Sequence, residues 1–133
     1  MTMITPEPWG QDSLSPALTF ELSGGLRSPG TARTLIGNAL EGCSAERIAT
    51  AQILVSELVT NAVLHAEPPI ALCIQLNGDQ LRVAVTDGSA AHPLARPLQN
   101  DIAHGRGLPL VEALSSSWGW HVAGFGKSVW FEL

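Results

Sequence analysis

Positive charge is scarce in this chain of 133 residues, which contains seven lysines and arginines against twelve aspartates and glutamates and has a formal net charge of −5. A protein that binds duplex DNA or RNA normally presents a basic face. Too few basic side chains are present to build a large one. The sequence therefore argues against direct binding to nucleic acid.

Long apolar runs are also absent, although 45% of the residues are hydrophobic. No segment approaches the ~20 apolar residues that a membrane-spanning helix needs. Residues 1–16 lack the basic region followed by an apolar stretch that marks a signal peptide. We therefore expect no membrane insertion and a cytoplasmic protein, with enough apolar material for one domain and its core.

Cysteine is limited to Cys43 and Cys73, which are not clustered as in a Cys/His metal site. Without an export signal, both are expected to be reduced thiols. Two common enzyme motifs are missing as well. The chain has neither a G-x-x-x-x-G-K-[ST] phosphate-binding loop nor a G-x-S-x-G hydrolase elbow.

The hydrophobic pattern predicts a two-layer α+β domain over residues 17–133, preceded by a proline-containing tail at 1–16 that we expect to be mobile. Predicted strands cover residues 17–22, 70–76, 81–87, 118–123 and 128–133, and predicted helices cover 28–40, 44–66 and 105–114. Turns at 77–80 and 124–127 predict antiparallel hairpins. We expect a mixed, mostly antiparallel sheet with the helices on one face.

The two longer helices have recognisable start signals. Ser28, followed by Pro29, and Ser44 are the expected N-caps. In the second helix, apolar residues recur at the spacing of a core-facing stripe. The stripe consists of Ile48, Ala51, Val55, Leu58 and Ala62.

Two polar side chains interrupt the apolar second half of that helix. Glu57 and Asn61 are spaced i, i+4 and share one side of it. Asn61 could offer a carbonyl oxygen to Mg²⁺, and Glu57 could deprotonate a hydroxyl or a water beside the metal. Alternatively, both side chains only bond to loops or to the end of another helix, and spacing alone favours this second interpretation. No lysine or arginine lies three or four residues from Glu57, so an intrahelical ion pair is excluded.

Two further signals lie downstream. Asp87 ends a strand, where a carboxylate could accept a hydrogen bond from an adenine amino group, or could simply form a turn. Gly105 and Gly107 open a helix whose N-terminus would attract phosphate, with Arg106 adding charge. A tight loop entering a helix would contain the same glycines. The segment 88–104 between the two signals is long for a loop and is expected to be a lid or floppy.

Taken in order, these signals resemble the N, G1 and G2 boxes of the GHKL superfamily, which contains gyrase, Hsp90, histidine kinases and MutL. Within it the chain is most similar to the histidine-kinase-like ATPase domains of anti-sigma factor serine kinases, small stand-alone actinobacterial ATP-binding proteins. The resemblance covers about residues 17–133. The matching segments are SELVTNAVLHA at 56–66, VAVTD at 83–87, GRGLPLV at 105–111, WG at 118–119 and GKSVWF at 126–131.

This resemblance implies a Bergerat fold that holds Mg·ATP between the long helix, the sheet and a lid at 88–104. It implies that Asn61 ligates Mg²⁺, that Glu57 is the general base on a protein serine and that Asp87 accepts from the adenine amino group. The residues implied to line the phosphates are Gly105, Arg106, Gly107 and the N–H of Leu108. Lys127 and Ser128 fall where the family has its last nucleotide-side motif.

The sequence departs from the superfamily at the loop after Asp87, where D-x-G-x-G is replaced by the residues DGSAA at 87–91. Asp87, Ser89 and Pro93 resemble the looser form of the small anti-sigma relatives.

Three functions remain open on this sequence. The first is an ATP-dependent serine/threonine kinase that phosphorylates a STAS-type anti-sigma factor antagonist in a partner-switching pathway. Such a protein would also bind a sigma factor, and related kinases are often homodimers. The second is a nucleotide-binding regulator that sequesters a protein partner with little or no turnover, which the altered loop favours. The third is an interaction protein on a degenerate fold.

Overall fold

The computed structural model describes four stretches of the chain, residues 17–65, 69–88, 107–123 and 126–133. The elements in chain order are β1 (Leu18–Leu22), α1 (Ser28–Ala39), α2 (Ala45–His65), β2 (Ile70–Asn77), β3 (Gln80–Asp87), α4 (Gly107–Leu114), β4 (Ser117–Ala123) and β5 (Gly126–Glu132). This order confirms the predicted strands and helices. The predicted tail at 1–16 and the predicted lid, apart from its first residue, lie outside the described residues.

The strands form one five-stranded sheet in the order β1-β2-β3-β5-β4. Every pairing between these described strands is antiparallel. The predicted two-layer α+β architecture is confirmed, whereas the expected mixed sheet is corrected to an antiparallel one. The reason lies in the connections. The helical hairpin of α1 and α2 returns the chain to the end where β1 stops, and β5 inserts between β3 and β4, which would otherwise be parallel neighbours.

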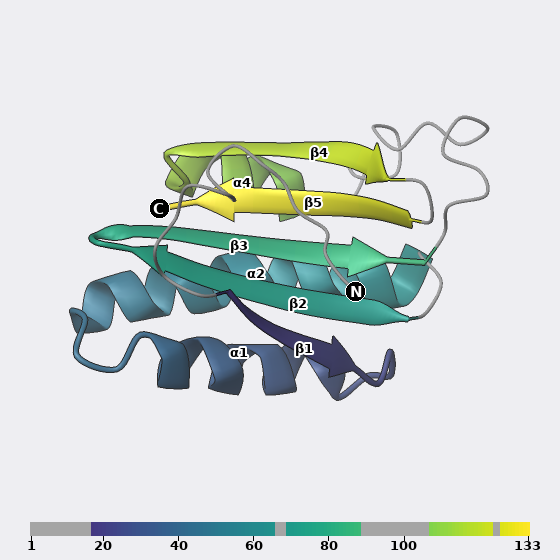
Figure 1. Cartoon of the computed structure of the whole chain (residues 1–133), viewed down its shortest axis with the longest axis horizontal. Helices are drawn as coiled ribbons and strands as arrows, with labels where there is room; N and C mark the ends of the chain where they lie inside the picture. The colour runs from purple at the N-terminus through teal and green to yellow at the C-terminus, as the bar shows by residue number, and fades with distance from the viewer. Residues whose placement is uncertain (1–16, 66–68, 89–106, 124–125) are drawn as a thin grey trace.

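The helices α1, α2 and α4 all cover the same face of the sheet, behind the strands in Figure 1. Alternate residues of the central strands point into this layer and are buried, as the period of two predicts. The predicted stripe of α2 faces them. Its members Ala51, Val55, Leu58 and Ala62 are buried, and Ile48 is partly buried against the same core.

The two predicted helix starts have different outcomes. Ser44 is confirmed as the N-cap of α2, because its Oγ accepts a hydrogen bond from the N–H of Arg47 at 3.1 Å. Ser28 is wrong as an N-cap, since Arg27 holds that position in α1. The buried Ser28 hydroxyl instead accepts from the N–H of Gly24 at 3.0 Å, so it stabilises the turn before the helix.

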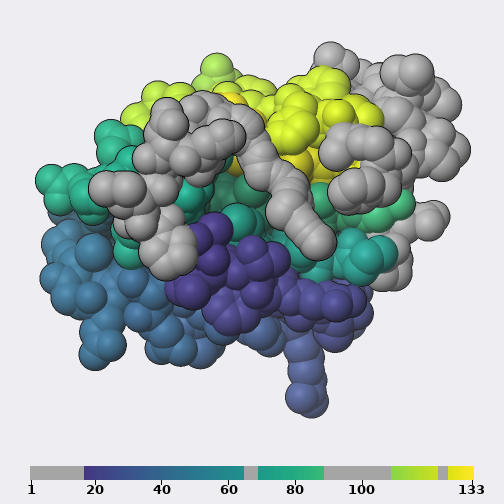
Figure 2. Space-filling view, in the orientation of Figure 1, coloured from purple at the N-terminus to yellow at the C-terminus, as the bar shows by residue number. Residues whose placement is uncertain are grey.

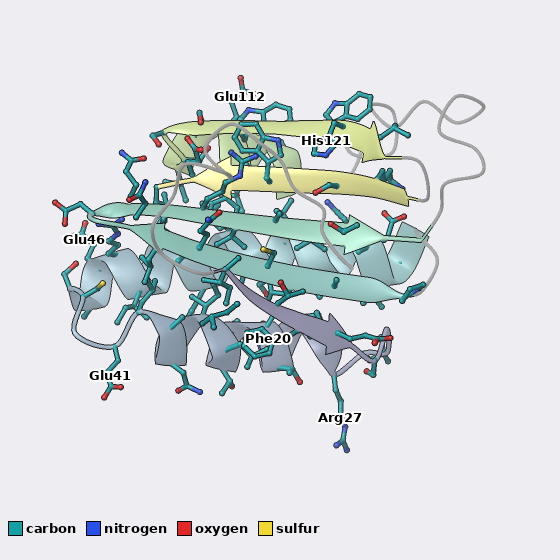
Figure 3. The ribbon with its side chains drawn as sticks, viewed as in Figure 1. Phe20, Arg27, Glu41, Glu46, Glu112 and His121 are labelled. Carbon is teal, nitrogen blue, oxygen red and sulfur yellow. The ribbon has the colours of Figure 1, made fainter. Side chains whose placement is uncertain are left out.

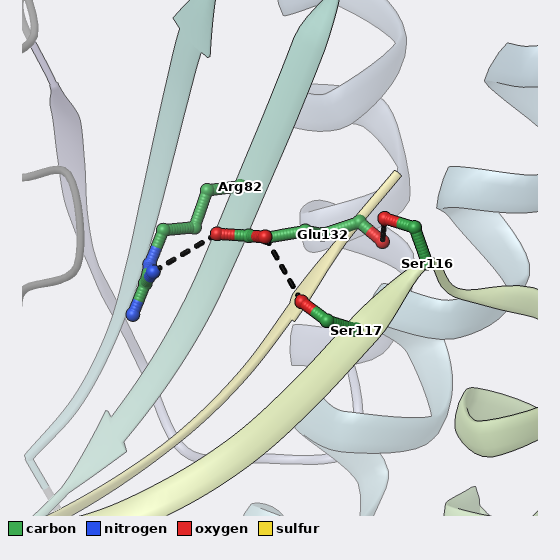
Figure 4. A network of polar contacts seen from close by, with 4 residues as sticks. All are labelled: Arg82, Ser116, Ser117 and Glu132. Carbon is green, nitrogen blue, oxygen red and sulfur yellow. Dashed lines mark hydrogen bonds and ion pairs between the residues drawn. The ribbon is translucent and has the colours of Figure 1, made fainter.

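The opposite face of the sheet carries no helix among the described residues, and its strands reach the surface between β1 and β4 (Figure 2). A polar network lies on it (Figure 4). Arg82 pairs with Glu132 at 3.1 Å, and Ser117 donates to the second oxygen of that carboxylate at 2.9 Å. The Arg82 guanidinium also lies 4.2 Å from the ring centroid of Trp130. This network joins β3, β5 and β4 on the face away from the helices.

The cysteines are free thiols. Burial raises the pKa of Cys73, while a hydrogen bond from Thr19 and the charge of Arg82 lower it to a smaller extent. Because the thiolate is the nucleophilic form, the raised pKa makes Cys73 a poor nucleophile. Across the described residues, no helix is long and apolar enough to cross a membrane.

Leu72 and Leu18 provide a matched test of this core, because both lie on the helix-facing side of the sheet but are 0% and 46% exposed. We expect Leu72→Ala to lower the free energy of unfolding by about 3–5 kcal/mol, through lost burial and a residual cavity. Leu18→Ala should cost less than about 1 kcal/mol. Urea denaturation followed by tryptophan fluorescence measures both, and equal losses would contradict the described packing.

Candidate functional site

The C-terminal half of α2 presents Glu57 and Asn61 to different surroundings. At ~100° per residue, Glu57 falls on the same side of the helix as Ile53 and Leu64, which are exposed. Asn61 is turned further toward the buried flank that contains Leu58. Ser56 lies on the other flank, where its hydroxyl accepts a 2.6 Å hydrogen bond from an arginine of α1. Asn61 therefore lies on the flank of α2 away from α1, and α2 runs between α1 and α4 in Figure 1 and packs against both.

The Asn61 side chain contains an unsatisfied polar atom. Its Nδ2 is buried and has no hydrogen-bond partner among the described residues. Such an atom costs about 1–3 kcal/mol of stability and is uncommon in native proteins. A 180° rotation of the amide exchanges Nδ2 with Oδ1, so the same position can present a carbonyl oxygen. An oxygen ligand suits Mg²⁺, which keeps several of its waters and is usually bound by only one or two protein side chains together with the phosphates of a bound molecule. Asn61 fits the role of such a protein ligand.

Glu57 is half-buried, and its carboxylate takes part in none of the ion pairs within the described part of the chain. The alternative that Glu57 only bonds to a loop or to the end of another helix thus gains no support from the described residues. Nor do any three His, Cys, Asp or Glu side chains gather into a metal-binding cluster within those residues.

Asp87 and Lys127 meet at the end of the ladder between β3 and β5, where they are register partners. Lys127 Nζ lies 3.0 Å from Asp87 Oδ2, and the two side chains are only 15% and 6% exposed. Asp87 shares its face of β3 with the buried Val85 and Val83. The ion pair therefore lies on the helix-covered face of the sheet.

Ser128 is not brought together with this pair. It is the register partner of Thr86, whose hydroxyl donates to the Ser128 hydroxyl at 3.2 Å. Because side chains alternate along a strand, Ser128 points to the face of the sheet away from the helices while Lys127 points to the helix face. Of the two residues assigned to the last nucleotide-side motif, the structure brings only Lys127 to Asp87.

Gly126 is the first residue of β5, and the close packing around it requires a residue without a side chain. A Cβ built on Gly126 would lie 2.1 Å from the carbonyl oxygen of Asp87, which is closer than real Cβ contacts. The backbones of β3 and β5 thus approach closely beside the Asp87–Lys127 pair. This requirement follows from the register of β3 against β5, two strands that are distant in sequence, so no local sequence pattern indicates it.

The helix α4 begins at Gly107, so the N–H of Leu108 lies in its first turn, where backbone donors lack intrahelical partners. Gly105 and Arg106 lie outside the described residues. Val111 anchors α4 to the core with no exposed area. A helix N-terminus of this kind attracts anions.

Comparisons with known proteins concern the family and the fold of the chain. A family model described as the histidine kinase-like ATPase domain matches residues 26–133. Among solved structures, the fold is similar to the crystal structure of the RsbU and RsbW domains of Rv1364c from Mycobacterium tuberculosis, with a TM-score of 0.67 and 24% sequence identity. That match covers 88% of this chain and 32% of the other, so this chain spans about a third of that protein's solved length. No curated protein matches the sequence.

Asn61 and Gln52 of α2 provide a test of the unsatisfied amide. The Gln52 amide donates to the Arg33 carbonyl at 3.0 Å, so Gln52→Leu should lower the free energy of unfolding by about 1 kcal/mol. Asn61→Leu removes no such bond from the nucleotide-free protein and should leave its stability unchanged or raise it by up to about 1 kcal/mol. Chemical denaturation compares the two variants, and a loss in Asn61→Leu as large as that in Gln52→Leu would mean that Asn61 has an internal partner.

Gly126→Ala tests the close approach of the two strands. The added methyl group must displace the Asp87 backbone, and overpacking of this kind costs about 1–3 kcal/mol. Gly25→Ala is the control, because a Cβ there would meet its nearest neighbour at 3.9 Å. Thermal unfolding of both variants gives the comparison. Equal midpoints would show that the strand ends separate freely.

Proposed function

Because this chain belongs to the family of histidine kinase-like ATPase domains, we propose that it binds Mg·ATP between the C-terminal half of α2, the N-terminus of α4 and the adjoining ends of β3 and β5. We further propose that it transfers the terminal phosphoryl group to a serine or threonine of a protein partner. The observation that carries the proposal is the buried Asn61 amide, which lacks a partner among the described residues.

The phosphate side of the proposed site combines Asn61 with backbone donors. Asn61 would hold Mg²⁺ through its side-chain carbonyl, and the bound metal would neutralise negative charge on the phosphates. The first N–H groups of α4, including that of Leu108, would donate to phosphate oxygens. Gly105 and Gly107 would allow the backbone to approach the phosphates, and Arg106 would add a positive charge.

The nucleobase side would be formed by Asp87 at the end of β3. Its carboxylate accepts hydrogen bonds only, which suits the exocyclic amino group of adenine. Asp87 is 6% exposed, so a hydrogen bond formed there is shielded from water. We include Lys127 in this side of the site because it contacts Asp87 directly. Ser128, which lies on the opposite face, would act only by fixing the strand.

Glu57 is the proposed general base. A base for a protein hydroxyl must be within reach of a macromolecule and of the phosphate at once. Glu57 falls on the exposed side of α2, and Asn61 follows one turn later. The exposed Ile53 and Leu64 lie on the same side, so a protein substrate approaching Glu57 would contact an apolar surface.

The proposed partner is a STAS-type anti-sigma factor antagonist in a partner-switching pathway that regulates transcription, and a sigma factor is the second proposed partner. Support comes from the sequence resemblance to anti-sigma factor kinases and from the similar solved structure, which contains an RsbW domain. The structural likeness itself concerns the fold alone.

The second candidate is a nucleotide-binding regulator that holds its partner with little turnover. It is favoured by the segment DGSAA at 87–91, which lacks both glycines of the superfamily loop. Tight binding of ATP without phosphate transfer to any antagonist would favour this candidate over the kinase.

Glu57→Ala tests the assigned base, and Glu46→Ala is the matched control on the same helix. Glu46, labelled in Figure 3, lies in the first turn of α2, whereas Asn61 lies near the C-terminal end of the same helix. Incubation with Mg·ATP and candidate antagonists should show that Glu57→Ala lowers the transfer rate by about 10²–10⁴-fold, the usual contribution of a general base. ATP affinity should stay close to that of the wild type, and Glu46→Ala should transfer normally. Transfer that survives in Glu57→Ala would exclude Glu57 as the base.

A further inference from the structure

We infer that Lys127 is a positioning residue that makes the proposed site select a 6-aminopurine over a 6-oxopurine. Lys127 would do this by fixing the carboxylate of Asp87 as a hydrogen-bond acceptor at the nucleobase position. The inference rests on the proposed function, because it concerns how the same nucleotide site reads its base.

The ion pair of Lys127 with Asp87 has the geometry of a fixed contact. The two charged atoms are 3.0 Å apart and both side chains are largely buried. Lys127 is also the single lysine of the sequence. Burying such a pair removes two charges from water, and a buried ion pair adds little net stability compared with packed apolar residues. Stability alone therefore does not account for a lysine and an aspartate at these two positions.

The backbone around the pair is held from both sides. Before Lys127, Gly126 lies against the Asp87 carbonyl so closely that a Cβ would clash. After Lys127, Ser128 is hydrogen-bonded to Thr86 across the same two strands. The Cα positions of Lys127 and Asp87 are therefore set by the ladder, and the contact with the Lys127 ammonium helps to orient the carboxylate.

The chemistry of the base determines what such a carboxylate can bind. An aspartate paired with an ammonium group is a carboxylate, which accepts hydrogen bonds and donates none. Adenine presents an amino donor at C6, whereas guanine presents an oxygen acceptor at the same position, as does hypoxanthine. A carboxylate offers about four lone-pair sites, so it can accept from Lys127 and from an amino group together. A 6-oxopurine would place an acceptor against an acceptor and is disfavoured.

ATP and inosine triphosphate (ITP) are the probes for this inference, because the 6-substituent changes between them from amino to oxo while the ribose and the phosphates stay the same. Isothermal titration calorimetry in the presence of Mg²⁺ gives the ratio of the two affinities. We expect the wild type to bind ATP at least about 10-fold more tightly, since sites that hydrogen-bond a substrate group reject analogues that leave their polar atoms unpaired. Lys127→Met should reduce this ratio at least about threefold, and Lys127→Arg should retain most of it because the charge is kept.

Arg82→Met is the matched control. Arg82 forms a second buried ion pair within the described strands, with Glu132 at 3.1 Å and side-chain exposures of 6% and 14%, but on the face away from the helices. Its loss should lower stability in the way that Lys127→Met does and leave the ratio of ATP to ITP affinity unchanged. A ratio that falls equally in both variants would assign the effect to general loosening of the sheet and overturn the inference. An unchanged ratio in folded Lys127→Met would overturn it as well.

Asp87→Asn keeps the inference testable if Lys127→Met does not fold. An amide can donate to the 6-oxygen, so the affinity ratio should shift toward ITP by at least about 10-fold. An unchanged preference for ATP would show that Asp87 does not read position 6 and would overturn the inference. Failure of the wild type to bind either nucleotide is a different result, because it contradicts the proposed function itself.

Discussion

The burial of one side of α2 against the antiparallel sheet is the interaction on which the rest of the structure depends. Val55, Leu58 and their neighbours along the stripe are removed from water, and each such side chain contributes about 1.5–3 kcal/mol. This contact fixes the rotation of the helix about its axis. Once the stripe faces the sheet, Asn61 falls on the buried flank and Glu57 on the exposed side, so the placement of the candidate site follows from core packing.

The groups of the candidate site are those that core packing alone would not select. Asn61 carries a buried polar atom without a partner in the described residues, the pair of Asp87 and Lys127 removes two charges from water, and Gly126 permits a contact that any other residue would prevent. The sheet shows the contrast on its other face. There Arg82 pairs with Glu132 and lies over the ring of Trp130, in a network that joins β3, β5 and β4.

Much of the fold could be predicted from the sequence because it depends on local periodicity. The hairpin at 77–80 has its two-residue loop at Gly78 and Asp79, with the positive φ of 66° that glycine tolerates. The helix stripe and the alternating strands are likewise properties of neighbouring residues. The prediction of Ser28 as an N-cap was wrong, because its hydroxyl accepts a hydrogen bond from the turn that precedes the helix instead of from the helix itself. The preference of serine for N-cap positions does not indicate which of these two partners it takes. The antiparallel sheet depends on how the helices return the chain, and the spacing of apolar residues does not contain that information.

The candidate site could be predicted only in part, for the same physical reason. The sequence pattern itself indicated Glu57, Asn61 and Asp87 as candidates, and the resemblance implied a role for each. The contact of Lys127 with Asp87, however, depends on the register of β3 against β5, which the sequence does not reveal. The separation of Ser128 from Lys127 could have been anticipated, since neighbouring residues of a strand point to opposite faces. Whether the Asn61 amide has a partner requires an inventory of every polar atom around it, and only a structure provides one.

Binding of ATP tests the central claim most directly. Calorimetric titration of the purified protein with ATP, first with Mg²⁺ and then with the metal removed by a chelator, measures whether a single site exists and whether the metal strengthens it. The account predicts saturable binding of one ATP per chain, with an affinity that falls when Mg²⁺ is removed. The absence of binding both with and without Mg²⁺ would contradict it.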